Sequence, residues 1–319
     1  MILVVIEHDR GALATASLEA LAAARGLGSP VAALTIGASA DALASTLAAH
    51  GATSVHQAHH ALLSDYGPEA WGEVVAQAVG ALAPTTVLAC GTDRGNEVMA
   101  QAAARLGQPM VANCVGFDDV ATGTWTLTRV RWGGSLLERC TLEATLKMVT
   151  VTHHAFESAE SPAAGTVAEL PVSLDASLAR TVVVERVERA AGVTLATSPL
   201  VVGGGRAVGS AEAFAPLEEL AGLLGGVVGC SRAVTNNGWR SHTDQVGQTG
   251  TRIAPDLYMA CGISGAIQHW VGAMASKKIL AINTDPEANM VVKADYAVIG
   301  DLHKVVPAIS AEIRRRRGG

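Results

Sequence analysis

The chain has 319 residues, of which 49% are hydrophobic and 16% are charged, and its net charge at pH 7 is −6. This composition excludes an intrinsically disordered chain, and the negative charge argues against nucleic acid as the main partner. The length accommodates two domains, and the small aromatic share of 3% beside many Ala, Val, Leu and Gly residues is typical of helices packed on buried parallel sheets.

Short apolar runs alternate with longer amphipathic stretches through the first third of the chain. This alternation indicates a right-handed, mostly parallel α/β sheet. The predicted strands are 2–6, 31–36 and 85–90, and the predicted helices are 14–25, 40–49, 69–82 and 95–106.

The pattern changes after about residue 110. The segments 125–134 (WTLTRVRWGG) and 146–154 (LKMVTVTHH) alternate apolar with polar residues, which predicts antiparallel strands added to the same sheet. The stretch 155–180 has no long periodic segment and is expected to be a surface excursion. The run 180–188 (RTVVVERVE) is predicted to form a final strand.

A second α/β unit is predicted from about residue 190. We therefore expect an α/β protein of two domains, 1–190 and 191–319, each a mostly parallel sheet flanked by helices, with the second doubly wound. Its predicted strands are 200–205, 226–230, 256–262 and 278–283, and its predicted helices are 211–224 and 301–316.

Two glycine-containing turns follow strands of this second unit. The turn 203–209 (GGGRAVG) departs from GxGxxG because Val208 replaces the third glycine, but Arg206 could neutralise a phosphate. The stretch 262–274 (GISGAIQHWVGAM) is predicted to begin a helix at the carboxyl edge of the sheet, with Ser264 as N-cap, Gly265 allowing close approach of a ligand, and His269 one turn below. This stretch alone does not exclude the alternative, a helix that only packs against the sheet and whose histidine is hydrogen-bonded within the protein.

Polar residues also cluster after the neighbouring strands. A core built on these strands does not require such side chains at its rim, so together with the two turns they indicate a large polar ligand such as a dinucleotide. They are Ser231, Arg232, Gln245, Gln248 and Thr249.

Other signals are weaker. The histidine clusters at 56–60 (HQAHH) and 153–154 lack metal-motif spacing, so no metal is predicted, and no GxSxG elbow is present. The five cysteines include no CxxC pair, which indicates a reduced, cytoplasmic protein. No apolar segment has the length of a transmembrane span, and the first residues lack a signal peptide's features.

The C-terminal residues resemble the α subunit of electron-transfer flavoprotein. The resemblance rests on 257–307, on DQVGQTG at 244–250 and on CSRA at 230–233. It covers about 198–310, with a looser match in the N-terminal half. It implies FAD bound mainly by the C-terminal domain, and a β subunit that contacts the N-terminal domain through 124–153 or 155–180 and completes a heterodimer.

The resemblance also implies roles for single residues. Arg206, Ser231, Ser264, Asn283 and Asp301 match contacts to the pyrophosphate, ribityl and adenosine parts of FAD. The segment Val246–Thr249 matches the loop along the isoalloxazine edge, with Thr249 near N5. His269 matches the residue near N1 and O2, and Arg232 matches the cation over the ring. The resemblance therefore implies that Thr249, His269 and Arg232 tune the redox potential of the flavin. The remaining implied FAD contacts are Gln245, Val246, Gly247, Gln248, Gly265, Ala266, Ile267, Gln268 and Leu302.

The function implied is that of an electron carrier without a substrate of its own. It would accept electrons from acyl-CoA-type flavin dehydrogenases of fatty acid β-oxidation and pass them to a quinone-linked oxidoreductase. The β subunit would carry AMP, or a second FAD in the alternative, a flavin-bifurcating version. An alternative of another class, a stand-alone α/β nucleotide-binding hydrolase or transferase, fits the hydrolase-like N-terminal half but leaves 230–301 unexplained.

Overall fold

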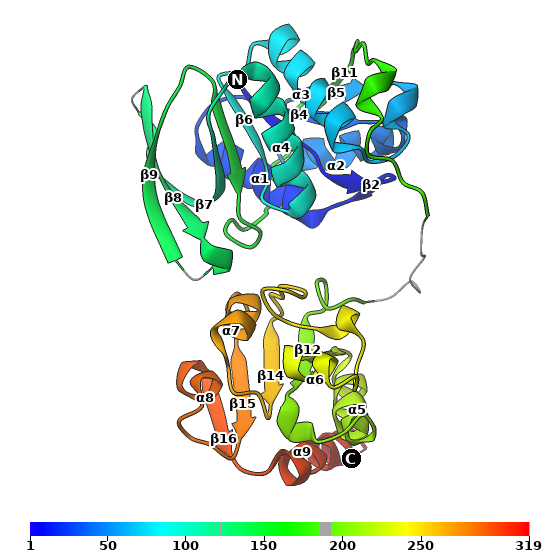
Figure 1. The fold of residues 1–319 in the computed structure, drawn as a ribbon, viewed down its shortest axis with the longest axis vertical. Helices are drawn as coiled ribbons and strands as arrows, with labels where there is room; N and C mark the ends of the chain where they lie inside the picture. Colours follow the sequence, from blue (N-terminus) through cyan, green and yellow to red (C-terminus); the bar gives the residue numbers. More distant parts are fainter. Residues whose placement is uncertain (122, 135, 186–192, 319) are drawn as a thin grey trace. The chain divides into compact units, whose positions relative to one another are not determined.

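The computed structural model describes residues 1–121, 123–134, 136–185 and 193–318 (Figure 1). The chain divides into two compact units, the first comprising Met1–Arg131 and Leu136–Glu188, the second Trp132–Ser135 and Arg189–Gly319. The predicted domain boundary at 190/191 lies outside the described residues.

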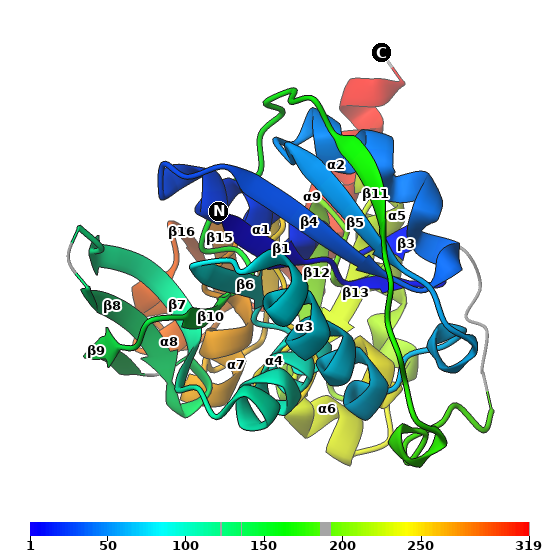
Figure 2. The same ribbon diagram turned by 90° about the horizontal axis from the view of Figure 1, so that it is seen from above.

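The first unit is built on a nine-stranded sheet, shown with its helices in Figure 2. Its strand order is β11-β5-β4-β1-β6-β10-β7-β8-β9, parallel throughout except for the antiparallel β7-β8-β9 edge. A small antiparallel pair, β2 (His8–Asp9) and β3 (Ala12–Leu13), stands apart from it. The nine strands are β1 (Ile2–Val5), β4 (Val31–Ile36), β5 (Ser54–Ala58), β6 (Thr86–Cys90), β7 (Met110–Asp119), β8 (Thr124–Arg131), β9 (Leu136–Glu143), β10 (Lys147–Val151) and β11 (Thr166–Leu170).

Helices cover both faces of this sheet because its central strands are apolar on both sides. In β1, Leu3 and Val5 pack with α3 (Pro68–Leu82) and α4 (Asp93–Leu106). The alternate residues Ile2 and Val4 pack with α1 (Thr15–Gly26) and with α2 (Ala44–Ala49), which follows a short 3-10 helix at Ala38–Leu43. The predicted α/β class with a mostly parallel sheet is confirmed.

The prediction that 146–154 forms an antiparallel strand is wrong. Strand β10 lies between β6 and β7 and is parallel to both. Its polar residues alternate with apolar ones yet are buried: Thr150 donates a hydrogen bond to Asn96 Oδ1 (2.7 Å) and accepts one from the Asn113 amide (2.9 Å). An alternation of polar and apolar residues ordinarily indicates a strand with one solvent-exposed face. Here hydrogen-bond partners from other elements allow the polar side chain of Thr150 to be buried instead.

The prediction of a final strand at 180–188 is also wrong over its described part. Residues 182–185 have no strand structure, and Val184 is 91% exposed; residues 186–188 lie outside the described chain. The strand at this edge of the sheet is instead β11, which pairs with β5. Strand β11 lies within 155–180, the stretch that was expected to be a surface excursion. Strand propensity at 180–185 was outweighed because the described chain offers these residues no partner strand.

The second unit has a five-stranded, wholly parallel sheet in the order β13-β12-β14-β15-β16. The strands are β12 (Leu200–Gly204), β13 (Val227–Cys230), β14 (Leu257–Cys261), β15 (Ile279–Asn283) and β16 (Tyr296–Ile299). The helices are α5 (Ala215–Leu224), α6 (Arg232–Asn236), α7 (Ile267–Ala273), α8 (Asn289–Lys293) and α9 (Leu302–Arg317).

This sheet is doubly wound. In β14, Met259 and Cys261 pack with α5, α6 and α9, whereas Tyr258 and Ala260 pack with α7 and α8 on the other face. The chain leaves β12 toward β13 over one face and leaves β14 toward β15 over the other. The two connections diverge, which opens a crevice at the carboxyl ends of β12 and β14, where ligands of such sheets bind.

None of the described helices combines the length and apolar character that a membrane crossing requires.

Candidate functional site

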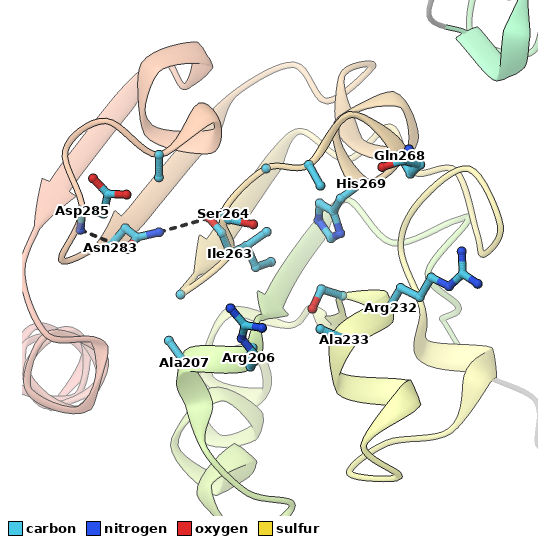
Figure 3. A pocket seen from close by; sticks show the side chains of 15 residues that line it. Arg206, Ala207, Arg232, Ala233, Ile263, Ser264, Gln268, His269, Asn283 and Asp285 are labelled. Atoms are coloured by element: carbon cyan, nitrogen blue, oxygen red, sulfur yellow. Dashed lines mark hydrogen bonds between the residues drawn. The ribbon is translucent and has the colours of Figure 1, made fainter.

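A cavity of about 470 Å³ opens at the carboxyl ends of β12, β13, β14 and β15. Its size falls within the range of small-molecule and cofactor sites. Figure 3 shows side chains of three different elements around it, Arg206, Arg232 and His269. The lining residues are Arg206, Ala207, Ser231, Arg232, Ala233, Gly262, Ile263, Ser264, Gly265, Ala266, Gln268, His269, Asn283, Asp285 and Ala288.

Glycine permits the close backbone packing that forms the cavity wall. Gly205 follows β12, and a Cβ there would lie 2.0 Å from the carbonyl oxygen of Gly262. Gly265 has a φ of +77°, and a Cβ there would lie 2.4 Å from the amide nitrogen of Met290. Both positions therefore need glycine, the second for its backbone conformation as well as for space.

The prediction of Ser264 as helix N-cap is wrong. Helix α7 begins at Ile267, and its N-cap is Ala266, without a side-chain capping bond. The left-handed conformation of Gly265 interrupts the helical path, so Ser264 stands one residue before the break, and its carbonyl accepts the Met290 amide (3.2 Å). Among the described residues, the Gly265 and Ala266 amides have no hydrogen-bond partner.

His269 carries a buried nitrogen that no described residue satisfies. The residue is 7% exposed and lines the cavity, and its Nε2 lies 2.7 Å from the Tyr258 hydroxyl. Burial raises the pKa of Tyr258 well above its usual value, so this residue is a neutral phenol. Its O–H has no other partner in the described chain, so we assign it as the donor to Nε2, which places the proton of the neutral imidazole on Nδ1. That buried Nδ1–H has no partner among the described residues and is a donor available to a ligand.

We expect acid to destabilise the C-terminal unit through His269. Burial lowers the pKa of His269 to about 4. The unfolded chain therefore binds a proton between about pH 6.5 and about pH 4 that the folded chain does not, so stability falls as pH decreases through this window. From about pH 7 to about pH 5 this residue should cost on the order of 2 kcal/mol.

Urea unfolding of the full chain at both pH values measures this loss. The His269→Phe variant should show a pH dependence smaller than that of the wild type by this amount, because the other titrating groups, including the buried His8, are shared. An equal pH dependence in both proteins would contradict the assignment.

Two arginines give the cavity a positive character. Arg206 begins a short 3-10 helix after β12, and Arg232 is the first residue of α6 after β13. Both side chains are exposed, and within the described part of the chain neither forms an ion pair. Their charges are therefore available to an anionic ligand such as a phosphate.

Two further predicted residues line the same cavity. The Asn283 side chain donates from Nδ2 to the Ile263 carbonyl (3.1 Å) and accepts the Asp285 amide (3.1 Å), so it holds the loops after β14 and β15 together (Figure 3). Ser231 is the N-cap of α6 but makes no side-chain capping bond to the described chain. Its hydroxyl remains available to a ligand.

The predicted loop 245–249 is held beside α7 but is not part of the cavity lining. Gln245 is 1% exposed, accepts a hydrogen bond from Thr235 (2.7 Å) and donates one to Thr249 (3.0 Å), and Val246 belongs to the apolar core. The Gln248 amide donates to the Gln268 carbonyl (2.7 Å), which ties the loop to the helix.

Three other predicted residues also lie outside the lining. Ile267 is an exposed residue at the start of α7. Asp301 accepts the His303 amide (3.0 Å) as the N-cap of α9, and the side chain of Leu302 packs in the core beneath the same helix.

The site prediction from sequence missed several lining residues. Most are small, and they contribute backbone or a single methyl group rather than a characteristic side chain. The only signal that could have found them is their position at or shortly after the carboxyl ends of predicted strands. They are Ala207, Ala233, Gly262, Ile263, Asp285 and Ala288.

Comparison with known proteins gives matches over the whole chain. Residues 2–202 match the electron transfer flavoprotein domain, and residues 194–274 match the electron transfer flavoprotein FAD-binding domain. A protein named electron transfer flavoprotein subunit alpha from Mycobacterium tuberculosis is 37% identical, with 99% of each chain covered. Proteins of the same name from Thermoanaerobacterium thermosaccharolyticum (35% identical; 97% of this chain and 96% of the relative) and Bacillus subtilis (34%; 98% and 97%) are similar over comparable lengths.

Proposed function

The chain belongs to the electron transfer flavoprotein family as an α subunit, and on that premise we propose that the cavity at the carboxyl ends of β12–β15 holds FAD and that the protein is an electron carrier without a substrate of its own. The observation that carries this proposal is the buried Nδ1 of His269, which lines the cavity and lacks a partner in the described chain. Bound FAD would supply the capacity to take up and release electrons.

The residues present fit such a cofactor. Arg206 and the partnerless amides of Gly265 and Ala266 would hold the pyrophosphate, because a guanidinium and backbone N–H groups are suited to phosphate oxygens. The Ser231 hydroxyl would bind a polar group of the cofactor, and Asn283 would keep the two loops in register. The segment 245–249 would flank the ring, as the resemblance implies.

His269 would favour the reduced cofactor without transferring a proton. Its lowered pKa keeps it neutral at neutral pH, and Tyr258 keeps the proton on Nδ1. A neutral N–H donor directed at the N1 and O2 edge of the ring stabilises negative charge that develops there. Because His269 is buried, water does not compete for this hydrogen bond.

The partners follow from the family. An α subunit requires a β subunit, and we propose a heterodimer whose β subunit carries AMP and contacts the N-terminal unit of this chain. We further propose acyl-CoA-type flavin dehydrogenases as donors and a quinone-linked oxidoreductase as acceptor. The cytoplasmic location stays a prediction.

Co-expression with the β subunit of the same organism tests the proposal. We expect a 1:1 heterodimer with one FAD and one AMP, whose flavin is reduced by an acyl-CoA dehydrogenase and its substrate under anaerobic conditions. Size-exclusion chromatography, nucleotide analysis and visible absorbance measure these outcomes. Two FAD per heterodimer would favour the bifurcating alternative, and a folded complex that binds no FAD would contradict the proposal.

A further inference from the structure

A second cluster of polar residues lies in the N-terminal unit, at the carboxyl end of β10. His153 and His154 follow this strand, and Glu19 comes from helix α1, which packs against the sheet. His153 Nε2 is 3.3 Å and His154 Nδ1 is 3.7 Å from the same carboxylate oxygen, Glu19 Oε1. The fold thus joins residues 135 positions apart in the chain.

The carboxylate of Glu19 is buried, and its residue is only 9% exposed. A buried charge requires a compensating partner. Oxygen Oε2 accepts the backbone amide of His154 (2.6 Å), whereas among the described residues Oε1 has only the two imidazoles as partners. A carboxylate oxygen beside two imidazole nitrogens is a set of three electron-pair donors, and such a set can bind one cation between them.

Two buried polar atoms just after β10 have no hydrogen-bond partner among the described residues. They are His153 Nε2, which lies beside the Glu19 carboxylate, and the hydroxyl oxygen of the preceding Thr152. His153 Nε2 lies within ion-pair distance of Glu19 without hydrogen-bond geometry. Unsatisfied buried polar atoms are uncommon in native proteins, and a missing ion is one recognised explanation.

The spacing suits a tetrahedral metal ion. Metal–ligand distances of about 2.0–2.2 Å place neighbouring tetrahedral ligands roughly 3.4 Å apart, close to the observed 3.3 and 3.7 Å. The three ligand atoms all lie within 4.8 Å of one another. The two rings are stacked, with centroids 3.6 Å apart and an interplanar angle of 23°, so one ring must turn for both nitrogens to direct their lone pairs at the same ion.

We propose that Glu19, His153 and His154 bind one divalent transition-metal ion of the zinc type, with water completing the coordination. Two neutral imidazoles and one carboxylate form a donor set that zinc takes in proteins. The ion links α1 to the end of β10 and neutralises the buried carboxylate. Neither histidine cluster in the sequence predicted this site, because the third ligand lies far away in the chain.

The test uses the full chain purified with its β subunit and without a polyhistidine tag. After EDTA treatment and dialysis, Co²⁺ is titrated and its visible d–d absorbance recorded. We expect one Co²⁺ per chain with tetrahedral-type bands, displaced by Zn²⁺. Glu19→Gln and His153→Gln should each weaken Co²⁺ binding at least tenfold.

His154→Gly provides a variant that preserves the backbone, because His154 has a φ of +66° that glycine adopts freely. It should also lose the ion while remaining folded by circular dichroism. His59→Ala is the matched control, since His59 also pairs with a carboxylate, Asp41 (2.9 Å), in the other histidine cluster. It should bind Co²⁺ like the wild type. A wild type without stoichiometric Co²⁺, or variants at Glu19 and His154 with undiminished binding, would overturn the proposal.

Discussion

Replacement of Gly265 by alanine is expected to remove FAD from the protein and to destabilise the C-terminal unit. Gly265 has a left-handed backbone, which costs other residues about 1–2 kcal/mol. Its Cβ would lie 2.4 Å from the amide nitrogen and 2.8 Å from the Cα of Met290, and overpacking of this kind costs about 1–3 kcal/mol. The combined loss is on the order of 2–5 kcal/mol, a large part of a typical domain's stability.

The loss of FAD follows from the backbone shift that relieves this clash. The atoms that must move belong to two segments: the start of α8, and the loop whose amides we assign to the pyrophosphate. Urea unfolding and the visible absorbance of bound flavin measure the two effects.

Gly222→Ala is the matched control for Gly265→Ala. Gly222 lies inside helix α5, and a Cβ there meets nothing within 4 Å. Alanine should therefore stabilise this helix by about 0.5–1 kcal/mol and leave flavin content unchanged. A Gly265→Ala protein with full flavin content would show that this loop does not hold the cofactor.

Replacement of His269 by phenylalanine is expected to lower the midpoint potential of bound FAD. The variant keeps a flat aromatic ring, slightly larger than the imidazole, but loses the Nδ1–H donor, which favours the reduced cofactor. A hydrogen bond to a charged group is worth about 1.5–3 kcal/mol, which corresponds to roughly 60–130 mV for a one-electron step. The buried Tyr258 hydroxyl also loses its partner, at a further cost in stability of about 1–3 kcal/mol.

Two comparison variants separate the possible causes of such a shift. Tyr258→Phe keeps His269 but releases the constraint on its tautomer, so it should shift the potential less. Arg232→Ala removes a full positive charge. The resemblance implied that Arg232 tunes the potential, but its side chain is exposed and solvent screens its charge. We therefore expect a smaller shift for Arg232→Ala than for His269→Phe. Spectroelectrochemical titration decides, and an unchanged potential in a flavin-loaded His269→Phe protein would exclude His269 from tuning.

Local periodicity was sufficient for most of the secondary structure. The strands predicted at 2–6, 200–205 and 256–262 appear as β1, β12 and β14, because a strand buried on both faces needs an apolar run that is visible in the sequence itself. The stretch 262–274 after a predicted strand made His269 one candidate site residue, because the carboxyl ends of parallel strands share one edge, but its role came from the neighbouring polar residues and the family resemblance.

Only the tertiary structure determined which polar groups meet. In the parallel strand β10, Thr150 is hydrogen-bonded by Asn96 and Asn113 from other elements. The proton position on His269 depends on Tyr258, a residue of the preceding strand. Glu19 reaches His153 and His154 only because α1 packs beside β10. A sequence pattern reports which face of an element is apolar, whereas a hydrogen bond between elements depends on sheet order and helix packing, which periodicity does not encode.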